Sequence, residues 1–306
     1  MADIFNTSSK TITIMTCSAC NENCNHCYIS YQGNKKVDEL KNMIINLQKQ
    51  GWQVMLNGSE PLLFDGFLDL YSMVGQDKIF SNGKILLQKP ELISNIVKSG
   101  LNKICLSYHY GVQDQWSKVS LEQVEKVVRM CKEKGLYVCL MCSLCQENYL
   151  HIDKICQKAK ELNADEIHFT NFICQGNAVK QGLQKHILSE EQILLSLKKI
   201  NELRNKYDIN DLKLTRCGSF GNNIGSKNYF CDAGIADFVI TPDNSIYPCI
   251  FFAGIEKYKL GEYVDGELKL NKKCNHNCDG CFAKDILNNK KDIPNLIQTV
   301  ESYILK

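Results

Sequence analysis

Short runs rich in β-branched and aromatic residues alternate with segments of helical periodicity through the first two-thirds of this 306-residue chain. This alternation is typical of β-α units that build a parallel sheet. We expect strands at residues 11–17, 53–58, 78–83, 103–109, 136–143 and 166–173. We expect helices at residues 37–50, 66–75, 90–99, 120–134 and 150–162, and a last one from the N-capping Ser189 to about 205. The first part of the chain therefore predicts an α/β fold of six β-α units.

The composition of the sequence changes at about residue 213. From there on it contains turns rich in Gly, Asn and Asp, short expected strands such as FVITPDNSIYP, and a second group of cysteines. We expect a main domain over residues 10–212 and a smaller α+β domain over residues 213–306. The terminal stretch DIPNLIQTVESYILK has a proline near its start and apolar residues at helical spacing. It is expected to form a helix that packs back on the smaller domain.

Composition excludes several classes of protein. The formal charge is +2, and Lys and Arg are scattered rather than clustered, so we expect no nucleic-acid partner. The N-terminus has no apolar signal region and no run approaches a membrane span, so we expect a soluble cytoplasmic protein with no membrane partner. Seventeen cysteines, an odd number, have no use as a disulfide framework in a reducing cytosol. Metal is the default explanation for the clustered ones.

The first cysteine cluster lies in the loop that follows the first expected strand. Cys20, Cys24 and Cys27 have the spacing C-x3-C-x2-C. Three thiolates can hold three irons of a 4Fe-4S cluster and leave the fourth iron open to another ligand. The spacing and its place resemble the signature of the radical S-adenosylmethionine (SAM) superfamily. A zinc knuckle that uses the same cysteines with His26 is the alternative.

The resemblance implies a partial (βα)6 barrel of the TIM type, a SAM-binding 4Fe-4S cluster, and SAM itself as cofactor. It extends to the ends of later strands, where ligands of parallel α/β folds gather. LNGSEPLL, FSNG, CLSYH and ICQGNA resemble family segments at these ends. The residues that the resemblance assigns to SAM binding are Tyr28, Gly58, Ser59, Glu60, Asn82, Ser107, Ser143 and Gly176.

The cysteines of the second module resemble the twitch or SPASM extension of radical SAM enzymes. The shorter twitch version implies one auxiliary 4Fe-4S cluster, held by Cys231, Cys249, Cys278 and Cys281, with Cys274 or Cys217 able to replace one of them. Asn244 stands where the family has a glycine, and Asn tolerates a left-handed turn. A structural zinc ribbon is the alternative.

Several other residues carry weaker expectations. Cys145 and Cys174 follow strands whose ends face the expected site, so either could give a hydrogen atom to a substrate radical. His109 could serve as a base, or it could be a solvated loop histidine. Four other cysteines are expected to be ordinary small apolar side chains: Cys17, Cys105, Cys131 and Cys156. Cys139, Cys142 and Cys145 cannot share one cluster if they lie on a strand, because alternate residues face opposite sides.

The resemblance implies an enzyme that reductively cleaves SAM to a 5'-deoxyadenosyl radical, which then takes a hydrogen atom from the substrate. We expect a ribosomally synthesised peptide that is crosslinked, joined by a thioether or epimerised. An electron donor such as flavodoxin or ferredoxin is implied. The first strand begins near residue 11, so we expect any leader peptide to be bound by a separate protein or by the catalytic domain. The alternatives are a small-molecule radical SAM dehydrogenase or rearrangement enzyme, and a non-catalytic zinc or iron-sulfur protein.

Overall fold

The computed structural model of the chain describes residues 10–76, 78–207, 211–217, 231–274 and 297–299. Its strands are β1 Thr11–Met15, β2 Gln53–Asn57, β3 Lys78–Ser81, β4 Lys103–Ser107, β5 Tyr137–Leu144, β6 Glu166–Asn171, β7 Lys213–Arg216, β8 Asp237–Ile240, β9 Ser245–Tyr247, β10 Gly261–Val264, β11 Glu267–Leu270, β12 Lys272–Cys274 and β13 Ile297–Thr299. The six strands predicted in the first part of the chain all form.

The helices alternate with these strands. They are α1 Val37–Lys49, α2 Phe67–Val74, α3 Lys84–Gln88, α4 Glu91–Lys98, α5 Gln113–Trp116, α6 Leu121–Glu133, α7 Ile152–Glu161, α8 Asn177–Lys180 and α9 Glu190–Lys206. Two of them begin with full capping boxes: Ser120 with Gln123, and Ser189 with Gln192. In each box the serine hydroxyl accepts from the N–H of the glutamine, and the glutamine side-chain oxygen accepts from the N–H of the serine. The cap predicted at Ser189 is therefore confirmed.

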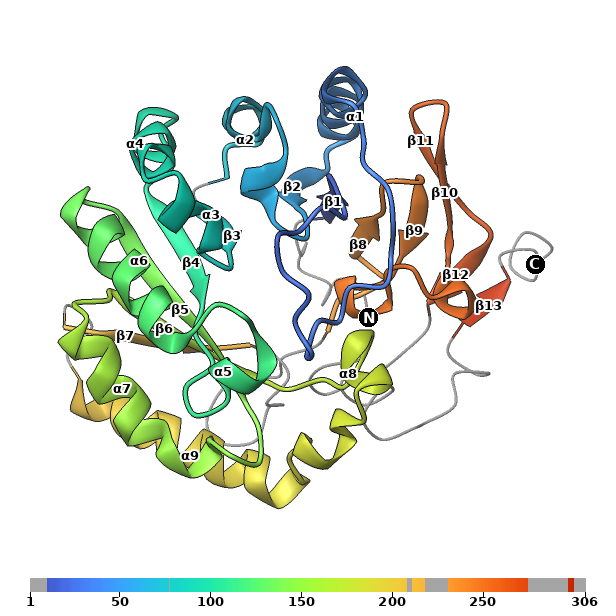
Figure 1. The fold of residues 1–306 in the computed structure, drawn as a ribbon. Coiled ribbons are helices and arrows are strands. Elements are labelled where there is room, and N and C mark those ends of the chain that lie inside the picture. The colour runs from blue at the N-terminus through green and yellow to red at the C-terminus, as the bar shows by residue number, and fades with distance from the viewer. Residues whose placement is uncertain (1–9, 77, 208–210, 218–230, 275–296, 300–306) are drawn as a thin grey trace.

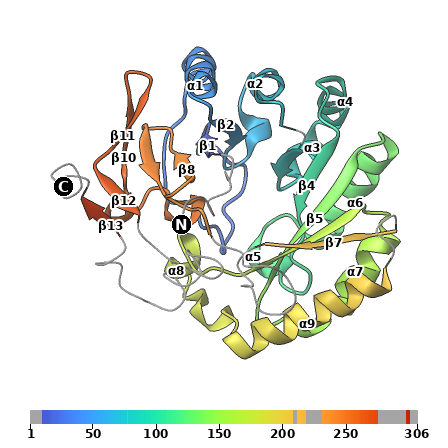
Figure 2. The same cartoon turned by 180° about the vertical axis from the view of Figure 1, so that it is seen from behind.

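Two sheets carry the fold. One is fully parallel and has the order β3-β4-β5-β6-β7. The other has the order β11-β10-β9-β8-β1-β2, in which β1 is parallel to both β2 and β8 while β8 to β11 form antiparallel pairs. Figures 1 and 2 show the strands following one another around an arc with the long helices on its outside. The predicted mixed α/β fold with parallel β-α units is confirmed.

The core lies between the strands and the outer helices. Each long helix turns an apolar stripe inward, as α6 does with Val124, Val127 and Val128. Ile104 and Leu106 of β4 belong to the same core. The other face of β4 therefore looks into the interior of the arc, since side chains alternate along a strand.

Two strand pairings join the two parts of the expected division. β7 pairs with β6 in register from Glu166 opposite Lys213, so the parallel sheet continues beyond residue 212. β8 pairs with β1, so the segment after residue 230 completes the first sheet rather than standing apart from it.

The prediction of a C-terminal helix is wrong for residues Ile297–Thr299, which form β13 antiparallel to β12. The stretch has an isoleucine and a threonine two positions apart, and the edge of β12 offers hydrogen bonds that helical periodicity alone does not reveal. The remainder of that expected helix lies outside the described residues.

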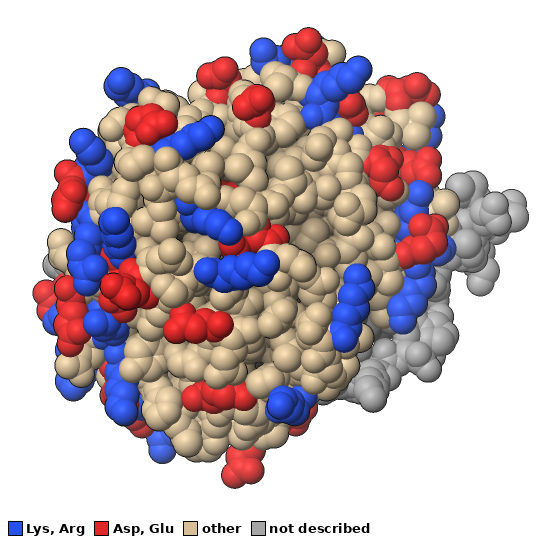
Figure 3. Space-filling model, in the orientation of Figure 1, with Lys and Arg blue, Asp and Glu red and all other residues tan. Residues whose placement is uncertain are grey.

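The surface in the orientation of Figure 1 carries acidic and basic side chains interspersed over all the outer elements (Figure 3). Across the described ranges, no helix is both long enough and apolar enough to cross a membrane.

Candidate active site

The loop after β1 brings its three motif cysteines to one cavity. Cys20, Cys24 and Cys27 all line this cavity, which has a volume of about 320 Å³. Cys20 is exposed and the other two thiols are half-buried. The preceding Cys17 is buried, as predicted.

Ionic and backbone contacts hold the cysteine loop to the helices beside it. The buried carboxylate of Glu22 forms an ion pair with Lys84 at the start of α3. The same ammonium donates to the carbonyl of Asn21 at 3.0 Å, and the N–H of Lys118 donates to Glu22 Oε2 at 3.0 Å. The N–H of Asn25 donates to the carbonyl of Trp116 at 2.8 Å. These contacts fix the loop against α3 and α5.

Residues that follow four successive strands converge on the same cavity. Its lining includes Gly58 and Ser59 after β2, Asn82 after β3, Ser107 at the end of β4 and Ser143 near the end of β5. The amide of Asn82 lies 3.7 Å from Cys20 Sγ, so a strand-end residue reaches a motif thiol. Tyr28 also lines the cavity, and its ring contacts Phe251 with 4.8 Å between the ring centroids.

Glu60 is placed differently from its neighbours Gly58 and Ser59. Its side chain is fully buried, and its carboxylate accepts hydrogen bonds from Ser81 Oγ at 2.9 Å and from the N–H of Asn82 at 2.8 Å. Burial raises the pKa of this carboxyl to about 7, against the lowering effect of those hydrogen bonds. In this conformation Glu60 ties the loop after β2 to the loop after β3.

Gly176 lies against the backbone of the cysteine loop. Its φ is +61°, and a Cβ at this position would come within 2.6 Å of the carbonyl oxygen of Cys27 and 2.8 Å of the carbonyl of Tyr28. The N–H of Asn177 donates to the same Cys27 carbonyl at 2.8 Å. The glycine is required here because no side chain fits between the two backbones.

Two histidines line the cavity and pack against Trp116 behind them. The rings of His26 and His109 meet edge to face at 4.6 Å, and His26 stacks on Trp116 at 5.0 Å. His109 Nδ1 accepts from the N–H of Ser143 at 3.2 Å, so the neutral ring carries its proton on Nε2. Burial lowers the pKa of both imidazoles, that of His26 to about 4. The solvated-loop interpretation of His109 is therefore wrong, because its ring is buried and lines the cavity.

Cys145 and Cys174, the predicted hydrogen donors, lie in a separate apolar cluster with Trp116 and Phe172. Neither thiol is among the residues that line the cavity. Burial raises the pKa of both. The thiol that does reach the cavity from a strand is Cys105, which the sequence had suggested is an ordinary apolar side chain. The sequence signal for this was Ser107, which was expected at the site: Cys105 lies two residues before it and therefore on the same face of β4.

A second cavity of about 420 Å³ adjoins the first and holds three further cysteines, Cys217, Cys231 and Cys249. Cys274 is buried in the main core instead, with its Sγ 3.1 Å from where a Cβ on Gly234 would lie. Cys278 and Cys281 lie outside the described residues. The residues that line both cavities are Asn57, Phe80, Thr170, Asn171, Ile173 and Phe251.

Asn244 adopts the predicted left-handed turn, with φ of +68°. It turns the chain between β8 and β9, and its side-chain oxygen accepts from the buried ammonium of Lys35. Lys35 also forms an ion pair with Glu39 of α1 at 2.9 Å. The loop that follows the cysteine motif is thereby joined to the C-terminal strands.

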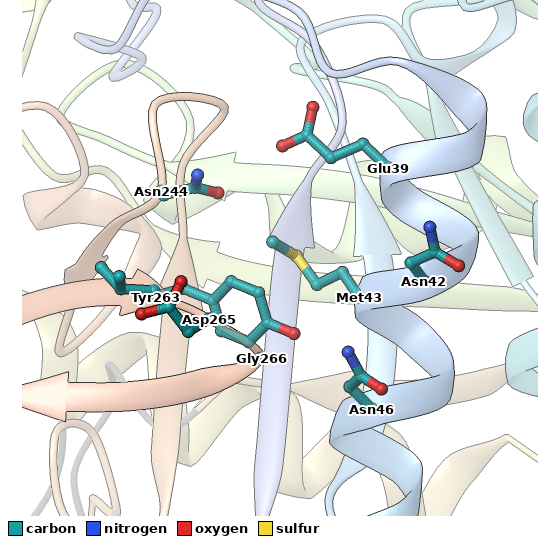
Figure 4. A pocket seen from close by; sticks show the side chains of 9 residues that line it. Glu39, Asn42, Met43, Asn46, Asn244, Tyr263, Asp265 and Gly266 are labelled. Atoms are coloured by element: carbon teal, nitrogen blue, oxygen red, sulfur yellow. The ribbon is translucent and has the colours of Figure 1, made fainter.

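Beside this link, a pocket of about 360 Å³ opens on the outside of the arc between α1 and the β10–β11 hairpin (Figure 4). Its lining consists of Glu39, Asn42, Met43, Asn46, Asn244, Tyr263, Val264, Asp265 and Gly266. None of the predicted cofactor or metal residues lies in it.

The chemistry of the motif thiols fits an iron-sulfur cluster. Desolvation raises the pKa of Cys20 to about 11 and that of Cys24 to about 12, and repulsion between the motif thiolates adds to both. A cationic metal centre removes this penalty because it stabilises the thiolates that it binds. Within the described residues, no three His, Cys, Asp or Glu side chains gather around a single-ion site. A 4Fe-4S cluster instead takes its thiolates to separate irons.

Comparison with solved structures identifies the architecture. SuiB of Streptococcus suis bound to precursor peptide SuiA superposes with a TM-score of 0.64 at 17% identity, over 82% of this chain and 61% of that one. The native anSMEcpe with bound AdoMet and Cp18Cys peptide gives a TM-score of 0.63 at 17% identity, over 82% of this chain and 77% of that one. Both were solved with a peptide bound, and the second also with AdoMet. The chain shares the fold of these two proteins.

In this shared fold the cysteine loop follows the carboxyl end of β1. The chain spans 61% of the length of the SuiB chain in the peptide complex and 62% in the complex with S-adenosylmethionine. No protein-family model matches the sequence, and no curated protein matches it.

Proposed function

We propose that the protein is a radical SAM enzyme that modifies a peptide. The observation that carries the proposal is the convergence of Cys20, Cys24 and Cys27 with the ends of β2 to β5 on one cavity. The radical SAM fold supports it, because motif spacing and fold are independent observations.

In the proposed site, Cys20, Cys24 and Cys27 bind three irons of a 4Fe-4S cluster. The bound cluster and SAM supply the 5'-deoxyadenosyl radical that takes a hydrogen atom from the substrate. SAM is proposed to lie along the strand ends, with Tyr28, Gly58, Ser59, Asn82, Ser107, Ser143 and Gly176 near it and Glu60 holding the loops in place. The rings of His26 and His109, with Trp116 packed behind them, are proposed to keep water from that side of the cavity.

A peptide is proposed as substrate because SuiB and anSMEcpe were each solved with a peptide bound. Crosslinking, thioether formation and epimerisation are the reactions considered. A separate leader-binding protein and a flavodoxin or ferredoxin as electron donor complete the proposed partners.

The second cavity is proposed to receive one auxiliary 4Fe-4S cluster. Cys231 and Cys249 line it and are close enough for their thiolates to repel each other. With Cys278 and Cys281 they make the proposed ligand set, and Cys217 or Cys274 is the substitute. We propose that residues 10–212 form the catalytic barrel and residues 213–306 the auxiliary-cluster domain, whose strands β8 to β11 extend the first sheet.

The test is anaerobic reconstitution with iron and sulfide, followed by iron analysis and an assay of 5'-deoxyadenosine after addition of SAM and dithionite. Wild type is expected to hold about eight irons per chain. A Cys20, Cys24, Cys27→Ala triple variant is expected to hold about four and to form no 5'-deoxyadenosine. Cys142→Ala, which removes a core thiol of β5, is the control and is expected to keep both properties. Full iron content in the triple variant, or zinc in wild type without 5'-deoxyadenosine, contradicts the proposal.

A further inference from the structure

The pocket on the outer side of the arc has the features of a binding site that the proposed clusters and SAM do not use. It has a volume of about 360 Å³ and lies between α1 and the β10–β11 hairpin (Figure 4). Small-molecule sites in proteins commonly have volumes of roughly 300–1,000 Å³. Among the described residues, none lines both this pocket and the cavity of the cysteine loop. A molecule bound in the outer pocket therefore lies apart from the proposed radical chemistry.

One side of the outer pocket is a row of polar side chains on α1. Glu39, Asn42 and Asn46 follow one another at intervals of three and four residues and therefore share one face of the helix. Asn42 and Asn46 are about 6 Å apart along the helix axis, because each residue adds roughly 1.5 Å. An extended peptide places every second residue about 6.6–6.8 Å further on. The two amides are thus spaced to reach alternate peptide groups of an extended chain, and each can both donate and accept, as a peptide group does.

Tyr263 of β10 lies across the pocket from this row, and its hydroxyl points toward α1 (Figure 4). The residue is only 8% exposed, yet its hydroxyl has no hydrogen-bond partner of ordinary geometry within the described residues. Burial raises the pKa of this hydroxyl and the amide of Asn46 lowers it by less, so the group keeps its proton at neutral pH. A buried hydroxyl without a partner lowers stability until a ligand satisfies it. The pocket therefore contains a polar group that a bound molecule can use.

The charged side chains of the pocket are carboxylates. Glu39 and Asp265 line it, and among the described residues no lysine or arginine does so. Each carboxylate has one oxygen in an ion pair with a lysine outside the lining, Glu39 with Lys35 at 2.9 Å and Asp265 with Lys269 at 3.2 Å. The side chains of Glu39 and Asp265 are 45% and 83% exposed, so both carboxylates are accessible to a second cation. The pocket therefore disfavours an anion and favours a ligand with ammonium or guanidinium groups.

The two carboxylates lie at opposite ends of the pocket. Asp265 directly precedes Gly266, where a Cβ would lie 3.2 Å from the amide nitrogen of Asn46. Glu39 is seven residues before Asn46, which is about 10 Å along α1. Three residues of an extended peptide cover this distance, at about 3.3 Å each. The first and third side chains of such a segment point to the same side, because side chains alternate along an extended chain.

We propose that the outer pocket binds an extended segment of the substrate peptide that carries two Lys or Arg side chains two positions apart. This rests on the proposed peptide-modifying function, which supplies the peptide. The amides of Asn42 and Asn46 bind the peptide backbone, the hydroxyl of Tyr263 bonds to a backbone carbonyl, and Glu39 and Asp265 pair with the basic side chains. Because the pocket and the cavity are separate, the bound segment is distinct from the residue that is modified. The pocket recognises the peptide and takes no part in the reaction.

The first experiment measures binding of small probes to the purified full chain without SAM or reductant. Saturation-transfer NMR titrations give the dissociation constants of acetyl-Lys-Ala-Lys-amide, acetyl-Glu-Ala-Glu-amide and 1,5-diaminopentane. The basic peptide is expected to bind at least about fivefold more tightly than either of the other two. Equal binding of the acidic peptide overturns the charge preference, and equal binding of the diamine overturns recognition of the peptide backbone. Failure of the basic peptide to bind overturns the proposal as a whole.

Variants that remove single charges test whether the basic peptide binds in this pocket. Glu39→Gln and Asp265→Asn are each expected to weaken its binding about threefold, and the double variant about tenfold. Asp38→Asn and Glu267→Gln are the matched controls, because each removes a carboxylate of α1 or of the hairpin that does not line the pocket. They are expected to bind the peptide as wild type does. Controls that weaken binding as much as the pocket variants overturn the assignment to this pocket.

Tyr263→Phe separates a binding role of the hydroxyl from a structural one. Because the hydroxyl has no partner in the unbound chain, its removal is expected not to lower the urea midpoint of unfolding. The basic peptide is expected to bind about fivefold more weakly to this variant. A lower midpoint with unchanged peptide binding shows that the hydroxyl is structural and contradicts the proposal. Circular dichroism checks that each variant folds.

The pocket and the radical SAM function can fail separately, because the binding experiments need neither a cluster nor SAM. A chain that binds the basic peptide but forms no 5'-deoxyadenosine after reconstitution contradicts the radical SAM function and supports the pocket. A chain that forms 5'-deoxyadenosine but does not bind the basic peptide overturns the pocket and leaves the radical SAM function intact.

Discussion

Replacing Gly176 by alanine tests whether the loop after β6 supports the cysteine loop. The added Cβ would lie 2.6 Å from the Cys27 carbonyl oxygen, which is backbone and cannot rotate away. Three costs follow: roughly 1–2 kcal/mol for an L-residue at positive φ, roughly 1–3 kcal/mol for overpacking, and about 1 kcal/mol for a weakened hydrogen bond from Asn177 to Cys27. We expect a loss of about 4 kcal/mol in the free energy of unfolding.

Gly182→Ala is the matched control for this substitution. Gly182 has a similar φ of +67° but has nothing within 4 Å of its Cβ position. Only the conformational cost applies there, about 1 kcal/mol. The reduced entropy of the unfolded chain is the same in both variants and cancels in the comparison. The difference of about 3 kcal/mol between the variants therefore measures the contact with Cys27 and Tyr28 together with the ψ of −124° at Gly176, which lies outside the left-handed helical region that Gly182 occupies with ψ of 33°.

Urea unfolding of the metal-free chain, followed by tryptophan fluorescence, measures both variants. Because Gly176→Ala also displaces the cysteine loop, we expect the reconstituted variant to lose iron, while Gly182→Ala retains it. Equal unfolding free energies for the two variants would refute the close approach of the two backbones and the role of Gly176 in positioning the motif.

Three further outcomes are expected. The native pKa of Glu60 is raised to about 7 from 4.5, so its burial destabilises the protein increasingly as pH rises through that window. In urea unfolding of the metal-free chain, Glu60→Gln should therefore gain about 2–3 kcal/mol of stability relative to wild type between pH 5 and pH 8. A difference in stability that does not change with pH contradicts this. Lys84→Met leaves the buried Glu22 carboxylate unpaired and should lower the free energy of unfolding by about 2 kcal/mol. Adding Glu22→Gln in the double variant should restore part of this loss. A loss below about 0.5 kcal/mol, which is that of an ordinary surface change, would show that the ion pair does not hold the loop. Cys231→Ala should lose about four irons on reconstitution while Cys274→Ala retains them, and iron analysis that gives the reverse would exchange the two assignments.

Local features were predictable because they depend on short stretches of chain. The capping box at Ser189 needs only residues three positions apart, and the turn at Asn244 needs only a residue that tolerates positive φ. The order of β-α units follows from hydrophobic periodicity in each segment. The spacing of Cys20, Cys24 and Cys27 places three thiols in one loop whatever the rest of the chain does.

The interior of the arc was less predictable because both faces of a parallel strand are buried. Cys105 and Cys142 have the same kind of sequence surroundings, yet one lines the cavity and the other lies in the core. Periodicity shows that alternate residues share a face, but not which face the helices cover. The burial of His109 depends in the same way on its contact with His26, which is distant in the sequence.

The sequence by itself therefore determined the kind of fold and the grouping of three cysteines in one loop, since these follow from local periodicity and from one short motif. The tertiary structure decided the pairing of β8 with β1, the joining of Cys105 to the cavity and its register with Cys139. These features depend on which distant strands become neighbours, and that is settled by the burial of apolar surface over the whole chain.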